Sequence, residues 1–244
     1  MNREVDRDRG GSEGERRPED PASHGPGSVV GAVLTAVLFD WGDPLMRWAW
    51  EPELLDAGHE AGLRAIGRAP SPAMTARFRD AYLPLLWMPG TLEEVEYPGL
   101  VRKLLAEEGI AVDDAELERF LEAEHAAWRP ARMLASTTHA LLEALRERGL
   151  KTGLVSNALD PPGLLHRDLA EMGVAARLDY AVFSSETGWR KPHPATFERA
   201  LDALSVEPGQ TLFVGDTLAA DVDGAAALGM HTCQALWFRP DEDA

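Results

Sequence analysis

Residues 31–40 read GAVLTAVLFD, and this continuously apolar stretch decides how the rest of the chain is interpreted. A Val-rich run without polar alternation is typical of a strand that is covered on both faces of a sheet. The apolar run over residues 29–39 has 11 residues, whereas a membrane-spanning helix needs about 20. It also follows an acidic tail and lacks a small-residue cleavage pattern, which argues against a signal sequence. We therefore predict a buried β-strand that ends at Asp40.

Helical and strand patterns alternate in the C-terminal half of the chain. Helices are predicted over residues 138–149, 163–172, 194–204 and 219–228, and strands over residues 151–157, 180–185, 211–216 and 231–237. Strands that alternate with helices of this length form parallel sheets through right-handed crossovers. The predicted fold class is α/β, with a Rossmann-like open parallel sheet as its core.

Between about residues 48 and 129 the pattern is helical, and we detect no strand pattern there. Predicted helix starts, each marked by a capping signal, are Ser71 with Pro72, Thr91 with Glu94, and Asp113 with Glu116. Pro84 and Pro98 are expected to kink or end their helices, and Gly109 is expected to stop another. These residues predict a separate, all-helical lobe inserted after the first strand of the sheet.

Composition and charge disfavour some classes of binding partner. The 244 residues are 45% hydrophobic and 27% charged, which is ordinary for a globular protein. Lys and Arg number 24 against 41 Asp and Glu, a net charge of −17, which disfavours nucleic acids and anionic membranes as partners. The single cysteine, Cys233, excludes an intramolecular disulfide, and we expect a cytoplasmic protein. Residues 1–28 are charged and rich in Gly, Pro and Ser, so we expect a disordered tail there.

The residues that end the predicted strands carry the chemistry. In open parallel sheets, ligands bind at the carboxyl ends of the strands, where the strand order reverses. Asp40 and Asp216 each close a strand, Ser156 and Asn157 close another, and Lys191 lies in the loop GWRKPHP. An Asp at a strand end is often only a turn or cap residue, a lone strand-end Ser is ambiguous, and a loop Lys is usually solvated. The set is nevertheless a coherent site, because two carboxylates, a hydroxyl and a lysine all lie at strand ends. Lys191 is also one of only three lysines in the chain, which suggests that a compact positive charge is needed there.

Four segments, in this order and with these separations, resemble the four motifs of the haloacid dehalogenase superfamily: FDWGDPL, LVSNA, RKPHP and VGDTLAADVDGA. The resemblance covers about residues 33–45 and 134–237. It implies an α/β hydrolase core over residues 29–45 and 130–239 and a helical cap over residues 46–129. The substrate implied is a small phosphorylated molecule, and we expect a monomer or homodimer.

The resemblance also implies a role for each matching residue. Asp40 would be the nucleophile, Ser156 and Asn157 would bind the substrate, and Lys191 would neutralise the crowded carboxylates. Asp40, the carbonyl of Gly42 and Asp216 would hold Mg²⁺, supported by Asp221. General chemical principles support the role of Asp40, because a carboxylate nucleophile divides a difficult group transfer into two steps. Oxygen ligands also suit Mg²⁺.

Gly42 departs from the family pattern. Phosphatases of the family read D-x-D-G-T here, where the second Asp is a general acid and then a base. This chain reads Asp40-Trp41-Gly42-Asp43-Pro44, so both that Asp and the usual Thr are absent. Asp43 is one position off and is expected to point elsewhere.

Three alternatives to a phosphatase therefore stay open. A non-catalytic binding protein with this fold is favoured by Gly42 and Pro44. A dehalogenase is disfavoured by the Gly215-Asp216 pair, which matches the metal-dependent members of the family. A phosphonate-cleaving enzyme would need a lysine in the cap, where Lys103 is predicted to lie on a helix surface.

Overall fold

A five-stranded parallel sheet forms the centre of the protein. The computed structural model describes residues 33–49, 51–87 and 90–238, so the predicted disordered tail lies outside the described residues. The strand order is β5-β4-β1-β6-β7, and each neighbouring pair is parallel. The strands are β1 (Ala36–Phe39), β4 (Lys151–Ser156), β5 (Tyr180–Phe183), β6 (Thr211–Gly215) and β7 (His231–Gln234). This arrangement confirms the predicted α/β class, although β1 is shorter than residues 31–40.

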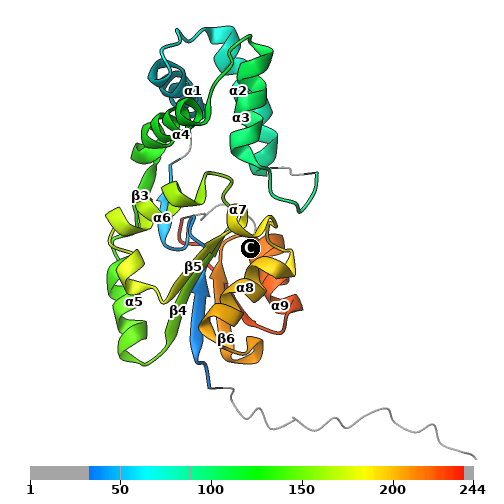
Figure 1. Ribbon diagram of the computed structural model, residues 1–244. Coiled ribbons are helices and arrows are strands. Elements are labelled where there is room, and N and C mark those ends of the chain that lie inside the picture. Colours follow the sequence, from blue (N-terminus) through cyan, green and yellow to red (C-terminus); the bar gives the residue numbers. More distant parts are fainter. Residues whose placement is uncertain (1–32, 50, 88–89, 239–244) are drawn as a thin grey trace, which may run out of the picture. The chain divides into compact units, whose positions relative to one another are not determined.

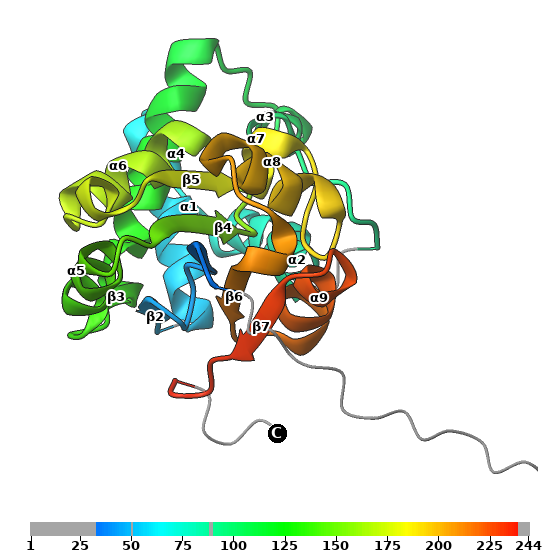
Figure 2. The ribbon, with the colours of Figure 1, turned by 90° about the horizontal axis from the view of Figure 1, so that it is seen from below.

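Different helices cover the two faces of the sheet. Successive residues of a strand point to opposite faces, so neighbouring residues of β1 pack on different helices. Val37 and Phe39 of β1 belong to an apolar cluster with residues of α5 and α6, whereas Leu38 belongs to a cluster with residues of α8 and α9. These helices are α5 (Thr138–Glu147), α6 (Pro162–Glu171), α8 (Pro194–Leu204) and α9 (Gly224–Ala227). Figures 1 and 2 show the two pairs of helices on opposite sides of the strands. Burial of β1 on both faces explains its continuous apolar sequence.

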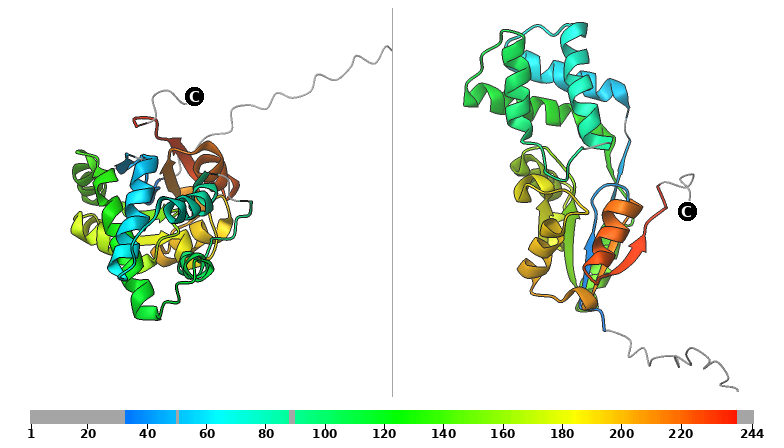
Figure 3. Two further views of the ribbon diagram at one scale, coloured as in Figure 1. Left: turned by 90° about the horizontal axis from the view of Figure 1, so that it is seen from above. Right: turned by 90° about the vertical axis from the view of Figure 1, so that its right-hand side faces the viewer.

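Four longer helices, which lie between β1 and β4 in the sequence, form a third apolar cluster. They are α1 (Pro52–Ala65), α2 (Pro72–Trp87), α3 (Tyr97–Glu107) and α4 (Asp114–Trp128), and Figure 3 shows them in cyan to green, packed on one another. Their core includes the fully buried rings of Phe78, Phe120 and Trp128. We call residues 46–134 the helical segment.

A short antiparallel ribbon begins and ends the helical segment. Strand β2 (Met46–Trp48) pairs with β3 (Arg132–Leu134), with Met46 opposite Leu134. The prediction that the region from about residue 48 to residue 129 contains no strand is therefore wrong at Trp48, the last residue of β2. Three-residue strands contain too few alternations to produce a recognisable period-2 pattern.

Two of the predicted helix starts are confirmed and one was wrong. Asp113 and Glu116 form a reciprocal capping box at the start of α4, and the Ser71 hydroxyl accepts a hydrogen bond from the backbone of Met74. Thr91 begins no helix, because α3 starts at Tyr97 and is capped by Glu96 instead.

Neither of the prolines predicted to kink or end a helix ends one, whereas the glycine stop is confirmed. Pro98 occupies the first turn of α3, where no backbone donor is needed, and Pro84 lies inside α2. Gly109 takes a φ of 74° directly after α3, a left-handed conformation that glycine adopts without strain. Lys103 is exposed on α3, as predicted.

The remaining helices of the described residues are short. They are η1 (Arg129–Ala131), η2 (Ala175–Arg177), α7 (Ser184–Thr187), η3 (Pro208–Gln210) and the π-helix η4 (Leu218–Asp223). The helix predicted over residues 219–228 is thus η4 followed by α9. Within the described part of the chain, no helix combines the length and apolar character needed to cross a bilayer.

Candidate active site

The strand-end residues meet at one edge of the sheet. Asp40 follows β1, Ser156 ends β4 and Asp216 follows β6, and β1 lies between the other two strands. The backbone N–H of Asp40 donates to the carbonyl of Val214, 2.9 Å away, which continues the β1–β6 pairing to the end of the strand. The chain order reverses across β1, which is where open α/β sheets bind ligands.

Three carboxylates converge at this edge. One oxygen each from Asp40, Asp216 and Asp221 lies within 4.8 Å of the others. Asp216 and Asp221 are buried, and Asp40 is half-buried. Carboxylates this close repel one another in a poorly solvated site, so the arrangement needs a cation.

Lys191 supplies positive charge to the cluster. Its Nζ lies 2.9 Å from Asp40 Oδ1 and 2.6 Å from Asp221 Oδ1, and the residue is 4% exposed. Burial alone would lower the pKa of Lys191, but the carboxylates of Asp221 and Asp40 outweigh it and raise the pKa above its ordinary value. Its ammonium group is therefore charged at neutral pH.

Asp40 is subject to opposing influences. Burial raises its pKa, and the negative charge of Asp221 adds to that effect. The Lys191 ammonium and a hydrogen bond with the Ser156 hydroxyl act in the opposite direction by stabilising the ionised form. The hydrogen bond places Ser156 beside the group predicted to be the nucleophile.

Gly215 and Thr217 hold Asp221 in the cluster. The backbone N–H of Thr217 donates to Asp221 Oδ2 at 3.0 Å, within the π-helical turn after β6. A Cβ added at Gly215 would lie only 2.4 Å from the Asp221 side chain, so only glycine lets the two segments approach this closely. The glycine of the VGDT motif therefore has a packing reason.

Asn157 contacts the main chain of Lys191 with both ends of its amide. Its Oδ1 accepts a hydrogen bond from the Lys191 N–H at 2.7 Å, and its Nδ2 donates to the Lys191 carbonyl at 3.1 Å. The side chain thus joins the loop after β4 to the loop that carries Lys191. Its predicted contact with substrate stays a prediction.

The segment after Asp40 forms a tight turn. The Asp43 N–H donates to the Met46 carbonyl at 2.7 Å, and the Met46 N–H donates to the Trp41 carbonyl at 3.1 Å. Asp43 has a φ of 68°, which non-glycine residues rarely adopt except Asn and Asp. A Cβ added at Gly42 would meet no atom within 4 Å, so this position has room for a side chain.

Two residues that the sequence does not predict as site residues lie beside the site. Arg190 directly precedes Lys191, and its side chain forms a buried ion pair with Glu94 of the helical segment. Glu94 had been interpreted only as part of a helix cap. A pairing over 96 positions leaves no local signal in a single sequence.

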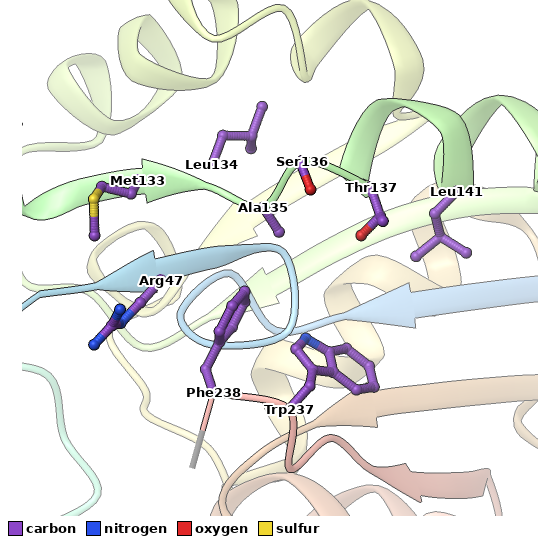
Figure 4. Close-up of a pocket in the computed structure, with 9 residues that line it drawn as sticks. All are labelled: Arg47, Met133, Leu134, Ala135, Ser136, Thr137, Leu141, Trp237 and Phe238. Atoms are coloured by element: carbon purple, nitrogen blue, oxygen red, sulfur yellow. The ribbon is translucent and has the colours of Figure 1, made fainter. Parts of the chain in front are cut away.

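The two described cavities lie elsewhere. One of about 560 Å³, drawn in Figure 4, has a mostly apolar lining with Arg47 at one side. Its other lining residues are residues 133–137, Leu141, Trp237 and Phe238. The second, about 430 Å³, lies along α3, α4 and α6. None of the site residues lines either cavity.

The sequence of this chain is similar to those of known proteins. The family model described as haloacid dehalogenase-like hydrolase matches residues 36–229. The phosphoserine phosphatase of Thermus thermophilus is 29% identical over 211 residues, which cover 78% of this chain and 83% of that protein. The haloacid dehalogenase-like hydrolase domain-containing protein 3 of Bos taurus is 38% identical over 93 residues, but the match spans only 36% of its length and 38% of this chain.

A solved structure shares the fold. The crystal structure of a HAD phosphatase from Thermococcus onnurineus superposes with a TM-score of 0.58 at 23% identity, covering 86% of this chain and 89% of the other. At this identity the likeness concerns the fold alone.

Proposed function

This chain belongs to the haloacid dehalogenase-like hydrolase family, and we propose that it is a Mg²⁺-dependent phosphatase for a small phosphorylated metabolite. The observation that carries the proposal is the convergence of three carboxylates at the carboxyl end of the sheet, two of which pair with Lys191. The similarity to a phosphatase over most of both chains supports the same reaction class.

The donor atoms at the site fit Mg²⁺. Three carboxylates within 4.8 Å of one another form a set of hard oxygen ligands, which Mg²⁺ prefers. We propose that Asp40, the main-chain carbonyl of Gly42 and Asp216 hold the ion, with Asp221 supporting it. When bound, Mg²⁺ would neutralise charge on the phosphoryl oxygens.

In the proposed reaction, a carboxylate oxygen of Asp40 attacks phosphorus. The bond from phosphorus to the leaving oxygen breaks, the leaving group takes a proton from solvent, and an aspartyl phosphate remains. Lys191 and the Ser156 hydroxyl stabilise the phosphoryl oxygens. Water then attacks phosphorus, inorganic phosphate leaves, and the Asp40 carboxylate is restored.

Gly42 determines which phosphates react well. Without a carboxyl group at this position, no acid from the first motif protonates the leaving group, and general acid–base catalysis contributes about 10²–10⁴-fold. Leaving groups that are already weak bases need this help least. We therefore propose a preference for acyl, aryl or anhydride phosphates over alkyl monoesters. Equal turnover of alkyl and aryl phosphates by the purified protein would remove this preference.

We propose that the helical segment acts as the cap that selects the substrate. The proposed bounds of the cap, residues 46–129, are those predicted from the sequence. Glu94 of this segment contacts Arg190, the residue before Lys191. Substrate selection by the segment would therefore occur close to the reacting groups.

A non-catalytic binding protein is the second candidate, and Gly42 is the observation that favours it. A phosphate-release screen with and without Mg²⁺, spanning acyl, aryl, sugar and nucleotide phosphates, separates the two. We expect weak, metal-dependent release that Asp40→Asn abolishes. Release that persists in the Asp40→Asn protein, or its absence with every phosphate, contradicts the phosphatase.

A further inference from the structure

Three residues within the helical segment pair with the loop that carries Lys191. We call residues 92–94 the strap. The N–H of Glu94 donates to the Gly188 carbonyl at 2.9 Å, and the N–H of Arg190 donates to the Leu92 carbonyl at 2.8 Å. Between these bonds, Glu93 and Trp189 form an antiparallel bridge. The strap is therefore joined to the loop by main-chain hydrogen bonds in strand-like geometry.

The side chain of Glu94 reinforces this pairing. It is 1% exposed, and its two oxygens lie 3.0 and 3.1 Å from Nη1 of Arg190, whose side chain is 9% exposed. The hydroxyl of Ser184 donates to Glu94 Oε2. A buried ion pair with an additional hydrogen bond has a defined geometry, and loss of one partner leaves an uncompensated buried charge.

Lys191 is the next residue after this ion pair. Its own N–H and carbonyl are bound by Asn157 from the sheet side, and its ammonium group contacts Asp40 and Asp221. The loop is thus held at Lys191 by the sheet and at Arg190 by the strap. A shift of Arg190 is transmitted along the backbone to the ammonium group.

We propose that Glu94 is a positioning residue for Lys191, acting through Arg190 and the strap, an inference that rests on the proposed phosphatase function. Contact between the helical segment and the loop then determines whether the ammonium group lies against the carboxylates. Glu94 itself does not touch the reacting atoms.

The chain contains a matched control for this proposal. Glu122 on α4 and Arg167 on α6 form another ion pair between the helical segment and the part of the chain that surrounds the sheet, 3.1 Å apart and with both side chains exposed. This pair does not contact the strap or residues 188–191. Glu122→Gln therefore removes a comparable charge without loosening the loop.

The first test measures the accessibility of lysine and needs no catalytic activity. The chain has only three lysines, Lys103, Lys151 and Lys191, so reaction with a small amine acylating reagent can be followed at each by peptide mass spectrometry. In Glu94→Gln we expect the labelling rate of Lys191 to rise several-fold, with the exposed Lys103 unchanged as the internal reference. Equal labelling of Lys191 in Glu94→Gln and wild type, or an equal rise in Glu122→Gln, overturns the proposal.

The second test measures turnover of an aryl phosphate with Mg²⁺. Misplacement of a reacting group by about 1 Å can cost about 10²-fold in rate, so we expect Glu94→Gln to lower kcat by about that factor while KM changes little. Because Glu94 acts through Arg190, the double variant Glu94→Gln/Arg190→Met should lose no more than the worse single variant. Unchanged kcat together with increased labelling of Lys191 overturns the positioning role, because it shows that Glu94 only covers Lys191 without setting the place of its ammonium group in the reaction.

The two proposals fail in distinguishable ways. If the wild-type protein hydrolyses no phosphate, the proposed function fails, and the labelling rates still decide whether Glu94 holds Lys191. If the wild type is active and Glu94→Gln matches it in both kcat and labelling, only the role of Glu94 fails.

Discussion

Gly215 packs directly against Asp221: a Cβ added at Gly215 would lie 2.4 Å from the Cβ and Cγ of that carboxylate residue. Gly215→Ala should therefore displace Asp221, which pairs with Lys191. We expect the free energy of unfolding in urea to fall by roughly 1–3 kcal/mol, the usual cost of overpacking. Mg²⁺ affinity, measured by isothermal titration, should fall as well.

Gly209→Ala is the control for this prediction. A Cβ at Gly209 would meet no atom within 4 Å, so the same change there should leave stability unchanged or slightly higher. Equal stability of Gly215→Ala and wild type would show that Asp221 can move without cost.

Gly42→Asp should add the acid that the first motif lacks. The position has room, because no atom lies within 4 Å of an added Cβ. We expect turnover of an alkyl phosphate monoester to rise by about 10²-fold, the lower end of the contribution from general acid catalysis. Gly42→Asn supplies similar bulk without an acid, so a comparable gain in that variant would refute this explanation.

Phosphorylated Asp40 should persist in the wild-type protein. The missing carboxyl group at Gly42 also weakens activation of the water that attacks the intermediate. After treatment with an acyl phosphate and Mg²⁺, intact mass spectrometry should show one added phosphoryl group, and Asp40→Asn should show none. Failure to detect the adduct in rapidly quenched wild type would count against slow dephosphorylation.

A buried ionic network joins β3, α4 and α6, and it should make stability depend on pH. Asp168 lies 2.6 Å from Arg132 and 3.0 Å from His125, whose other ring nitrogen lies 2.8 Å from Asp160. Burial would raise the pKa of Asp168, but the hydrogen bond with His125 and the charge of Arg132 lower it below 3.8. Burial would lower the pKa of His125, but its bonds with Asp160 and Asp168 raise it above 6.5.

The contribution of this network to the free energy of unfolding should therefore be greatest between an acidic and an alkaline pH limit. Asp168 contributes above pH 3.8, and its contribution is lost as the pH falls through its lowered pKa. His125 contributes below pH 6.5, and its contribution is lost as the pH rises through its raised pKa. Asp168→Asn should cost roughly 3–5 kcal/mol at neutral pH and remove the acid dependence, as measured by urea unfolding across pH. As a control, His166 is half-buried and pairs with Glu186 at 3.1 Å outside this network, and His166→Gln should cost less than about 1 kcal/mol.

Glu124 should tolerate replacement by Gln. Burial raises its pKa well above the ordinary value, which favours the protonated carboxyl group, and burial lowers the pKa of the neighbouring His59 to about 3, so His59 is neutral at pH 7. Gln keeps the acceptor for the Tyr97 hydroxyl, which lies 2.9 Å from Glu124 Oε1. We expect Glu124→Gln to lie within about 1 kcal/mol of wild type, whereas Glu124→Ala loses roughly 1–3 kcal/mol by leaving that hydroxyl unpaired.

The same pair of variants tests the direction of the pKa shift. A raised carboxyl pKa contributes stability that is lost as the pH rises through the folded value, so Glu124→Gln should flatten that alkaline decline. If Glu124→Gln destabilises the protein as much as Glu124→Ala, then Glu124 is ionised in the folded state.

The sheet and the site were largely predictable because both depend on local patterns. Continuous apolar strands that end in Asp40 and Asp216, at the carboxyl edge of a parallel sheet, bring distant residues together by topology alone. The family match over residues 36–229 confirms the resemblance inferred from the four motifs. The approach of Asp40 to Asp216 follows from the same rule, whereas Asp221 and Lys191 are brought in by the segments that follow the strands.

What was missed depends on contacts between remote segments. The Glu94–Arg190 pair joins two segments whose partners are not specified by neighbouring residues, and Glu94 has a spacing from Thr91 that mimics a helix cap. The β2–β3 ribbon consists of three-residue strands, too short for a periodic signal. Pro98 is a local exception: its sequence predicts a kink or end of a helix, although its missing N–H suits the first turn of a helix equally well.

The β2–β3 ribbon has a consequence for how the chain assembles. Pairing of Met46 with Leu134 brings together the two ends of a long intervening stretch, so the entropic cost of closing that loop is met at the ribbon itself. This cost grows only logarithmically with loop length. Insertions in the connections between the helices should therefore add little to this cost, and chimeras that exchange one helical module for another should keep Glu94 and His125, which pair with Arg190 and Asp168.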